Sequence, residues 1–426
     1  MLARLLCALL LVALVMDASA PAVRSQIAVS GEAVPEFTPF DEAVTSLLER
    51  WSIPGAALAV SRNGHLVLAR GYGLADVSAG RQVQPDSLFR VASVSKPITA
   101  VAIMQLVEQE RLSLDAPAYM LLDRLIPTDP SARDPRLAGA TVRTLLQHTG
   151  GWDRGRSFDP LFMPWFKTAA EEYGDRFPTS CETVARFMLA RPLDFAPGAG
   201  YAYSNFGYCL LGLIVERISG QPYQAYVREH VLMPAGISRM ALGRTAPDER
   251  LSDEVTYYDI PDARLASNIL GRGPALVARP YGAFALEAMA ANGGWVGSAM
   301  DLVRFADALD GRAGMPLLLN ETLATMTERP ERIWQNTSSY YGMGWLVRPV
   351  RGGATLWHTG SLPGSYALLV RQQQGTTWAV VFNSRPADTV GFGDAVEKAL
   401  AEAARSVDEW PEHDQYTRWY STPGRR

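Results

Sequence analysis

The chain has 426 residues, a mass of 46.5 kDa and 48% hydrophobic residues, so it is long and apolar enough to bury a large core, which we expect to be divided between two lobes. A formal net charge of −4 and a pI near 5.8 supply no basic surface for phosphate backbones, and nucleic acid is therefore not an expected partner. Lysine is scarce: only Lys96, Lys167 and Lys398 are lysines among the 40 Lys and Arg residues.

The N-terminal residues have the layout of a secretory signal. One basic residue is followed by an apolar run from Leu5 to Met16 and then by small residues up to Ala20. The run has about 12 residues, fewer than the ~18 to 20 that a membrane-spanning helix needs. We therefore predict a signal peptide over residues 1–22, cleaved between positions 20 and 25, in preference to an uncleaved anchor. The mature protein is expected to be secreted or periplasmic, with no stable membrane span.

The first elements after this segment are a helix and a hairpin. Thr38-Pro39-Phe40-Asp41 combines a capping residue, a proline and an acidic first turn, which predicts a helix from there to about Trp51. The apolar runs 57–61 and 65–69 are separated by Asn63-Gly64, a strong signal for a tight hairpin turn. A β-hairpin is therefore expected early in the chain.

Ser93 and Lys96 form an S-x-x-K pattern at the start of a predicted helix. Spacing of three residues brings both side chains to one helix face, and the helix N-terminus favours negative charge on an attacking serine oxygen. A buried lysine can lose its proton, whereas arginine cannot, so Lys96 suits a general base. The alternative is a capping serine beside a surface lysine.

Helical signals dominate from about 93 to 330, and the Pro/Gly-rich stretch 259–283 predicts a long loop or partly structured insertion. Cys181 and Cys209 remain after signal removal, and they are either one disulfide or two buried thiols. Asn292-Gly293-Gly294, with the S-x-x-D helix start at Ser298, is interpreted as structural. The predicted helices cover 97–110, 141–147, 182–190, 206–219 and 299–309.

Tyr203-Ser204-Asn205 falls in a loop or cap just before the helix at 206–219. Taken singly, Asn205 is an N-cap and Tyr203 a buried aromatic. Beside a cationic lysine, Tyr203 would have a lowered pKa and could pass a proton between serine and leaving group, while Asn205 binds a substrate amide.

His-Thr-Gly occurs at 148–150, ending a helix, and at 358–360, ending a strand-like segment. An edge strand can lie beside an extended substrate, with the N–H of Ser361 facing the cleft, so the second copy is the predicted site element. His148 is expected to pack near the mouth of the site. His65, His230 and His413 have no partner pattern and are expected to be structural.

Strand-like segments return at 345–348, 354–358, 366–371 and 377–383, followed by a helix at about 390–404. The predicted fold class is α+β: an antiparallel sheet of N- and C-terminal strands, flanked by helices, with an inserted, mostly helical lobe. The domain is expected over 37–405, with the sheet lobe at about 37–92 and 330–405, the helical lobe at about 93–329, and a surface tail at 406–426.

In this order, the motifs resemble the penicillin-recognising serine hydrolases, the class C β-lactamases and D-alanyl-D-alanine carboxypeptidases with their esterase relatives. The stretches LFRVASVSKPITA, TVRTLLQHTGG, FAPGAGYAYSNFGY, NGGWVGSAMDLVRF, YGMGW and HTGSLPG carry the resemblance over about residues 37–405. It implies that Ser93 is acylated, that Lys96 and Tyr203 move protons, and that Asn205 orients substrate. His358, Thr359 and Gly360 would line the facing strand, with the backbone N–H groups of Ser93 and Ser361 as oxyanion hole.

One departure concerns the substrate. Class C β-lactamases usually have lysine where this chain has His358, which is largely neutral near pH 7. A fixed charge for a substrate carboxylate must then come from elsewhere, and Arg348 and Arg351 are the candidates near that strand.

The leading function is therefore acyl transfer through a Ser93 ester, most like a D-alanyl-D-alanine carboxypeptidase or esterase acting on a small molecule or short peptide. The alternatives are a class C-like β-lactamase and a catalytically weak binding or scaffold protein. No metal or organic cofactor is expected, because the sequence has no H-E-x-x-H, C-x-x-C, G-x-G-x-x-G or P-loop, and it has no G-x-S-x-G either. The oligomeric state is left open.

Overall fold

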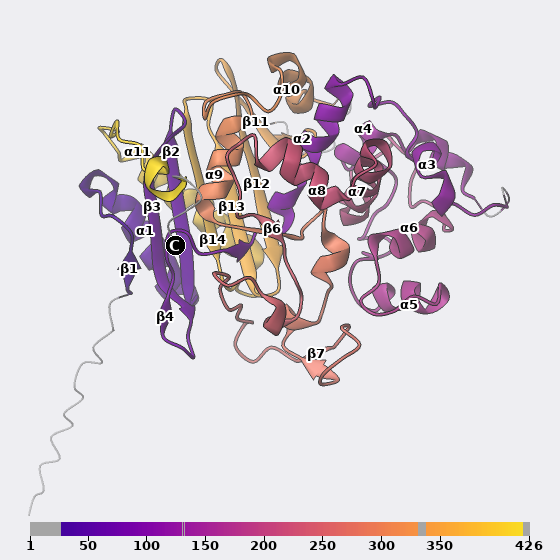
Figure 1. The fold of residues 1–426 in the computed structure, drawn as a ribbon, viewed down its shortest axis with the longest axis horizontal. Coiled ribbons are helices and arrows are strands. Elements are labelled where there is room, and N and C mark those ends of the chain that lie inside the picture. Colours follow the sequence, from indigo (N-terminus) through magenta and orange to yellow (C-terminus); the bar gives the residue numbers. More distant parts are fainter. Residues whose placement is uncertain (1–26, 130, 132, 331–337, 421–426) are drawn as a thin grey trace, which may run out of the picture.

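A computed structural model of the protein describes residues 27–129, 131, 133–330 and 338–420. An antiparallel sheet fills one side of the molecule, and helices fill the other (Figure 1). Its strand order is β1-β3-β2-β14-β13-β12-β11-β10, with β4 paired to β3. The strands are β1 (Val29–Ser30), β2 (Gly55–Arg62), β3 (His65–Asp76), β4 (Arg81–Gln82), β10 (Tyr340–Tyr341), β11 (Leu346–Val350), β12 (Gly353–Leu362), β13 (Ser365–Arg371) and β14 (Thr376–Phe382).

A strand from the N-terminal part of the chain and one from the C-terminal part pair in the middle of this sheet. The predicted hairpin joins β2 to β3, and its turn residues Asn63 and Gly64 both have positive φ, as a two-residue turn of this kind requires. Strand β14 pairs along β2, from Thr376 opposite Arg62 to Phe382 opposite Ala56. The predicted fold class is therefore confirmed, including the pairing of N- and C-terminal strands.

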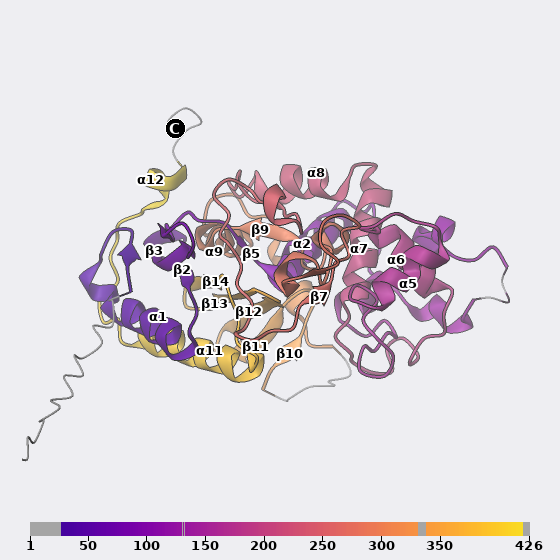
Figure 2. The ribbon, with the colours of Figure 1, turned by 90° about the horizontal axis from the view of Figure 1, so that it is seen from below.

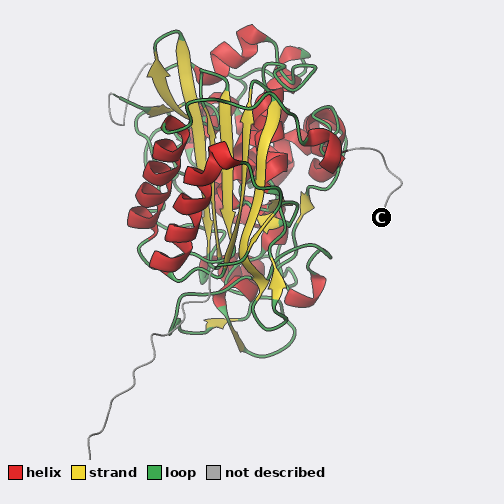
Figure 3. Cartoon of the chain, turned by 90° about the vertical axis from the view of Figure 1, so that its left-hand side faces the viewer, coloured by secondary structure: helices red, strands yellow, loops and turns green. Residues whose placement is uncertain are grey.

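Helices cover both faces of the sheet. Helices α1 (Thr38–Trp51) and α11 (Thr389–Arg405) pack side by side across the outer face (Figures 2 and 3). Helix α9 (Ala299–Ala308) packs on the inner face against β2 and β14, although it falls within the segment expected to be the helical lobe. The S-x-x-D pattern before it forms a capping box between Ser298 and Asp301, as predicted.

Helix α2 (Ser95–Glu108) is the centre of the molecule, because every residue from Ser95 to Leu106 is buried. A helix that is buried on all sides must be surrounded by other elements. Here these include α7, α8 and α10. The remaining helices are α3 (Ala118–Leu121), α4 (Val142–Leu146), α5 (Trp165–Glu172), α6 (Cys181–Leu189), α7 (Asn205–Ser219), α8 (Tyr223–Val227), α10 (Asn320–Thr327) and α12 (Tyr416–Tyr420).

Two uncertain points of the sequence are resolved. Cys181 and Cys209 form a disulfide that links α6 to α7. The stretch 259–283 is partly structured, since it holds a small hairpin of β7 (Ala266–Ser267) and β8 (Leu276–Val277). A further small sheet, which the sequence did not indicate, joins β5 (Phe89–Arg90), β9 (Trp295–Gly297) and β6 (Ala241–Leu242).

The segment after α11 does more than lie on the surface, as the sequence had suggested. Gln415 donates its backbone N–H to the Leu66 carbonyl, and the Tyr416 side chain is buried. The Tyr420 hydroxyl donates to Asp301 at 2.7 Å. The predicted signal peptide lies outside the described residues, and in the part of the chain that is described no helix has the length and apolarity needed to cross a membrane.

Candidate active site

Ser93 lies in a short 3-10 helix, η2 (Ala92–Val94), that leads directly into α2. Strand β5 precedes it and is held by β9, and the Val91 N–H donates to the Trp295 carbonyl at 3.0 Å. Ala92 has a φ of +48°, a left-handed conformation that costs free energy in a residue with a side chain. The backbone next to Ser93 is therefore bent sharply and anchored from one side.

Lys96 is fully buried, one helical turn after Ser93. Its Nζ lies 3.0 Å from Ser93 Oγ, 2.8 Å from Asn205 Oδ1 and 2.8 Å from the Asn292 carbonyl oxygen. Burial lowers the pKa of Lys96 well below its usual value, while Asp159 raises it and Arg154 lowers it further by smaller amounts. The lysine predicted to be a base is therefore in an environment that favours the neutral amine.

The three partners of Lys96 determine where a neutral amine would direct its lone pair. A neutral Nζ has two N–H donors and one lone pair. Asn205 Oδ1 and the Asn292 carbonyl can only accept hydrogen bonds, so they take the two N–H groups. The lone pair then faces Ser93 Oγ, whose hydroxyl can donate to it. The arrangement suits removal of the serine proton.

Tyr203 lines the same cleft as Ser93, with its side chain buried beside the serine. Lys96 Nζ is 4.7 Å from the centre of the Tyr203 ring. The expected lowering of the Tyr203 pKa is wrong: burial raises it, and the neighbouring Ser93 side chain and the charge of Arg154 offset only part of this rise. Tyr203 is therefore a neutral phenol that can donate a proton.

Asn205 is the first residue of α7, and Ser204, not Asn205, caps this helix. The Asn205 Nδ2 donates to Asp159 Oδ2 at 2.7 Å, while its Oδ1 accepts from Lys96. Both ends of the amide are thus engaged by protein groups, and one N–H of Nδ2 remains for a substrate.

Strand β12 forms the opposite wall and offers an open edge. Its pairing with β11 ends at Trp357, opposite Leu346, whereas its pairing with β13 continues to Leu362. Residues 358–362 therefore have a strand neighbour on one side only among the described residues. Gly360 packs against Val91 and Ala92, just before Ser93, and a Cβ at this position would come within 2.1 Å of the Val91 carbonyl oxygen. Glycine allows the strand to lie directly beside Ser93.

His358 begins this wall and is held in one tautomer. Its Nδ1 donates to the Thr359 carbonyl at 2.6 Å, because that oxygen can only accept. The Nε2 then accepts from the Tyr341 hydroxyl at 3.0 Å. Burial, with a smaller effect from Lys96, lowers the pKa of His358 to about 3. His358 is therefore neutral at any ordinary working pH.

His148 lies buried behind the cleft, more deeply than the sequence suggested. Its ring is 4.3 Å from the Tyr203 ring and 4.4 Å from the Tyr341 ring, measured between centres. Its Nδ1 accepts from the Ser204 N–H at 3.2 Å. Its other nitrogen is buried with no hydrogen-bond partner in the described structure. His148 therefore packs behind Tyr203 and supports its loop.

These groups line a cleft of about 420 Å³, and two arginines bring positive charge to it. Arg385, just after β14, donates to Ser361 Oγ at 2.7 Å, and no carboxylate of the described residues forms an ion pair with it. The expectation for Arg348 is wrong, since it pairs with Glu397 of α11 on the outer face, and Arg351 lies exposed in the turn after β11. The lining residues are Ser93, Arg154, Phe162, Tyr201, Tyr203, Asn205, Met289, Asn292, Gly293, Tyr341, Leu346, His358, Thr359, Ser361, Leu362, Arg385 and Thr389.

A family model described as Beta-lactamase matches residues 40–403, most of the chain. The chain belongs to the Beta-lactamase family. Among curated relatives, esterase EstB of Burkholderia gladioli is 34% identical over 309 residues, which are 68% of this chain and 73% of that protein. Penicillin-binding protein 4* of Bacillus subtilis is 26% identical over 366 residues, 85% of this chain and 74% of its own.

The fold of this Beta-lactamase family member is also found in solved structures. D-amino acid amidase from Ochrobactrum anthropi superposes with a TM-score of 0.64 at 24% identity, covering 87% of this chain and 99% of that one. At this identity the likeness concerns the fold. Family membership and the serine–lysine geometry together make the chain a serine hydrolase.

The structure brings together the predicted serine, lysine, tyrosine, asparagine and residues 358–361, leaves out Arg348 and Arg351, and adds five residues to the site of this family member. Asn292, interpreted as structural, gives its carbonyl to Lys96 and lines the cleft. Its Nδ2 is buried without a partner among the described residues. The others are Arg154, Asp159, Tyr341 and Arg385. Two of the five stood in stretches that carry the family resemblance: Asn292 begins NGGWVGSAMDLVRF and Tyr341 begins YGMGW.

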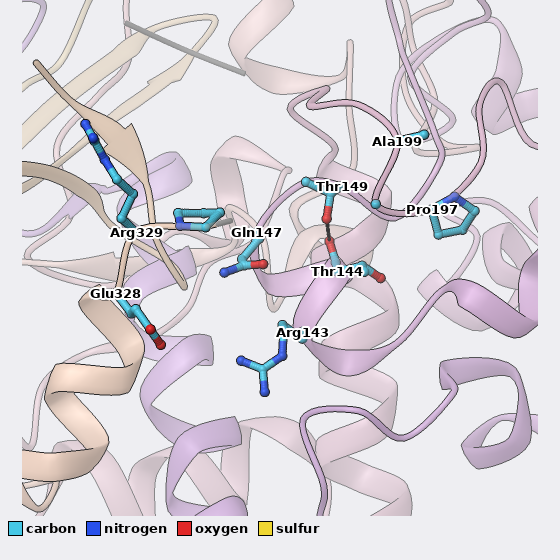
Figure 4. Close-up of a pocket in the computed structure, with 10 residues that line it drawn as sticks. Arg143, Thr144, Gln147, Thr149, Pro197, Ala199, Glu328 and Arg329 are labelled. Carbon is cyan, nitrogen blue, oxygen red and sulfur yellow. Dashed lines mark hydrogen bonds between the residues drawn. The ribbon is translucent and has the colours of Figure 1, made fainter. Parts of the chain in front are cut away.

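A second hollow, of about 550 Å³, is lined by Gln147 and Thr149, the two neighbours of His148 in the chain, and by residues near 197–199 and 328–330 (Figure 4). Thr149, one of its lining residues, donates to the Thr144 carbonyl at 3.4 Å. Arg143, also in this wall, forms an ion pair with Asp115. This second hollow has no serine–lysine pair among its described lining residues, so the smaller cleft at Ser93 is the candidate active site. No group of three or more metal-binding side chains occurs in the described parts of the chain.

Proposed function

We propose that this chain is an exported hydrolase that cleaves a small ester or amide through an acyl ester on Ser93. The observation that carries the proposal is the contact between Lys96 Nζ and Ser93 Oγ, with the other two lysine contacts made to groups that only accept. In this geometry the lone pair of the neutral amine faces Ser93 Oγ, so the amine can accept the serine proton.

The reaction begins when Ser93 Oγ attacks the substrate carbonyl and its proton moves to Lys96 Nζ. The carbonyl oxygen becomes an oxyanion that the backbone N–H groups of Ser93 and Ser361 stabilise. As the bond to the leaving group breaks, Tyr203 gives its phenolic proton to the leaving nitrogen or oxygen. The proton on Lys96 then returns to the Tyr203 oxygen. Water hydrolyses the Ser93 ester in a second cycle of the same kind.

The open edge of β12 supports binding of an extended substrate. Residues 358–362 pair with β13 alone among the described strands, so their other edge can take an added strand. His358 keeps its shape through Tyr341 and Thr359 and contributes no charge.

Arg385 supports a substrate that carries a carboxylate. It is partly buried and donates to Ser361, and Asp259, the carboxylate whose charge reaches it, is already paired with Arg279. A partly buried guanidinium with no ion-pair partner of its own among the described residues favours an anionic ligand. A carboxypeptidase-like substrate has such a group, while the likeness to esterase EstB favours an ester bond. The proposed substrates therefore combine a small acyl ester or amide with a nearby carboxylate.

Export is supported by the layout of residues 1–22 and by the Cys181–Cys209 disulfide, which is stable in an oxidising compartment. Periplasmic and extracellular destinations are both consistent with these features. Fractionation of cells that express the full chain, followed by mass analysis of the mature N-terminus, tests this part.

The intact mass of the signal-free protein tests the chemistry, after brief exposure to a penicillin, a p-nitrophenyl ester and a D-Ala-D-Ala peptide. Ser93→Ala is the control for acylation. Arg385→Gln should raise KM for the carboxylate-bearing substrates about 10-fold or more. The KM for the neutral ester should stay nearly unchanged. Arg348→Gln, on the outer face, is its matched control.

Each outcome assigns a different function. A long-lived penicillin adduct on wild type alone supports a carboxypeptidase-like enzyme, and rapid penicillin turnover supports a β-lactamase. Ester turnover with no penicillin adduct supports an esterase. A folded protein that neither forms an adduct nor turns over any of the three substrates is a binding or scaffold protein, and the proposal is then wrong.

A further inference from the structure

The loop between α4 and α5 carries two opposite charges next to the candidate base. Arg154 and Asp159 both act on Lys96, with opposite signs. Asp159 is held within the loop itself, because its Oδ1 accepts the Leu161 N–H at 3.2 Å and its carbonyl accepts the Phe162 N–H. Its Oδ2 is thereby turned toward α7, where it accepts from Asn205 Nδ2 at 2.7 Å.

This contact decides how the Asn205 amide is oriented. An amide can be turned by 180° with little change in shape, exchanging its oxygen and nitrogen. A carboxylate accepts hydrogen bonds and cannot donate them, so the amide end facing Asp159 must be nitrogen. The end facing Lys96 must then be oxygen, which gives the 2.8 Å contact to Nζ.

We propose that Asp159 is a positioning residue of the acylation site: it fixes the Asn205 amide with its oxygen toward Lys96 and so aims the lysine amine at Ser93. The inference rests on the proposed function for its catalytic consequence, since it concerns how the base is held. Without the carboxylate, the Asn205 amide is free to turn its NH₂ group toward Lys96, and the amine loses one of the acceptors that direct its lone pair.

The negative charge of Asp159 has a second effect on Lys96. It makes the protonated amine more favourable and raises its pKa, while Arg154 lowers it and burial lowers it most. The polar and titratable groups that face Lys96 come from several elements: Ser93, Arg154, Asp159, Tyr203, Asn205 and the Asn292 carbonyl, with Tyr208 at 5.7 Å from ring centre to Nζ and with His148 and His358 influenced by its charge. Among the charged groups, only Asp159 opposes the effect of burial.

The scarcity of lysine allows a direct test that needs no turnover. With ¹³C-labelled lysine, the spectrum contains the side-chain signals of only three lysines, Lys96, Lys167 and Lys398. We expect the Lys96 signal to titrate well below the usual range of a lysine. Asp159→Asn, which keeps a hydrogen-bond acceptor but loses the charge, should lower the Lys96 pKa by about 0.5 to 1 unit. Arg154→Gln should move it in the opposite direction.

Kinetics then separate positioning from charge. In Asp159→Asn the acid limb of kcat/KM for a p-nitrophenyl ester should move to lower pH, by the shift seen in the NMR titration. Asp159→Ala should also lower kcat by about 10- to 100-fold with little change in KM, because the Asn205 amide is released. Asp153→Asn, in the same loop and bonded to the Gly155 N–H, is the matched control and should change neither quantity.

Two results would overturn the inference. One is an unchanged Lys96 titration in Asp159→Asn, which is informative even where Asp159→Ala fails to fold. The other is an Asp159→Ala protein with wild-type kcat. Failure of the proposed function looks different: Ser93→Ala and wild type would then show equal turnover, whatever the NMR titration of Lys96 shows.

Discussion

The two His-Thr-Gly tripeptides have the same sequence and opposite surroundings. His148 follows α4 with a φ of +59° and points its ring into a group of tyrosines, where Nε2 has no partner among the described residues. His358 lies in an extended strand with both ring nitrogens hydrogen-bonded. Both rings pack against Tyr341, so the two motifs come together at this tyrosine. The backbone conformation around such a tripeptide, more than its sequence, decides whether it packs behind the site or lines it as a binding strand.

The glycines of the two motifs should show the largest difference. Gly360→Ala places a Cβ 2.1 Å from the Val91 carbonyl oxygen, which must move β12 away from Ser93. We expect kcat/KM for a p-nitrophenyl ester to fall by about 100-fold or more, since an error of ~1 Å in a site has this cost. At Gly150 the new Cβ meets the side chain of Leu145 at 3.0 Å, which can adjust. Equal losses in Gly150→Ala and Gly360→Ala would break the comparison.

The histidines themselves should differ in stability. His148→Ala removes a buried ring that packs on Tyr203 and leaves the Ser204 N–H without its acceptor. We expect urea denaturation to show a loss of about 2 to 4 kcal/mol in the free energy of unfolding. His148→Phe, which keeps a ring, should recover part of it. A His148→Ala protein as stable as wild type would show that the ring does not support the wall.

The two histidines should share one pH effect. Burial lowers the pKa of His358 to about 3 and that of His148 well below 6.5. Below about pH 6.5 the unfolded chain therefore binds protons at both rings while the folded protein does not. The free energy of unfolding should fall as the pH drops toward 3, by up to about 1.4 kcal/mol per pH unit for each ring.

This effect is measured as a difference between proteins, because carboxylates also titrate at low pH. Urea curves at pH 7, 6, 5 and 4 for wild type, His148→Phe and His358→Gln give the slope for each ring. Both variants should show a shallower loss with acid. Between pH 5 and 9, His358→Gln should leave the shape of the kcat/KM profile unchanged, because His358 does not titrate there.

The threonines should show the smallest effects. Thr359 lines the cleft, so Thr359→Val should raise KM several-fold with little change in stability. The Thr149 hydroxyl makes only a 3.4 Å contact with the Thr144 carbonyl, and Thr149→Val should change the free energy of unfolding by about 0.5 kcal/mol or less. A larger KM effect at Thr149 than at Thr359 would reverse this assignment of the two tripeptides.

Local signals predicted the parts of this molecule that local physics determines. The Asn63-Gly64 turn, the apolar strands and the capping box at Ser298 each follow from a few neighbouring residues. The serine, lysine and tyrosine of the site were found because their spacing and flanking residues have a recognisable pattern. Such features depend little on the rest of the fold.

The residues missed are those whose role depends on distant neighbours. Asp159 matters because α7 brings Asn205 to it, and Arg385 because β12 brings Ser361. Nothing in the adjacent sequence distinguishes either residue from a surface charge. The same reason explains the error at Arg348, which is close to the site strand in sequence but faces the opposite side of the sheet.

The pairing of β14 with β2 has a consequence for how the protein is made. The Gly55 N–H donates to the side chain of Asn383, 328 positions later, so the centre of the sheet closes only when nearly the whole chain is present. Until then one edge of the early hairpin has no partner, and an unpaired apolar strand invites association with other chains. A ribosome that stops before residue 376 would release an aggregation-prone fragment. Synthesis of β14 supplies the partner strand that closes the sheet.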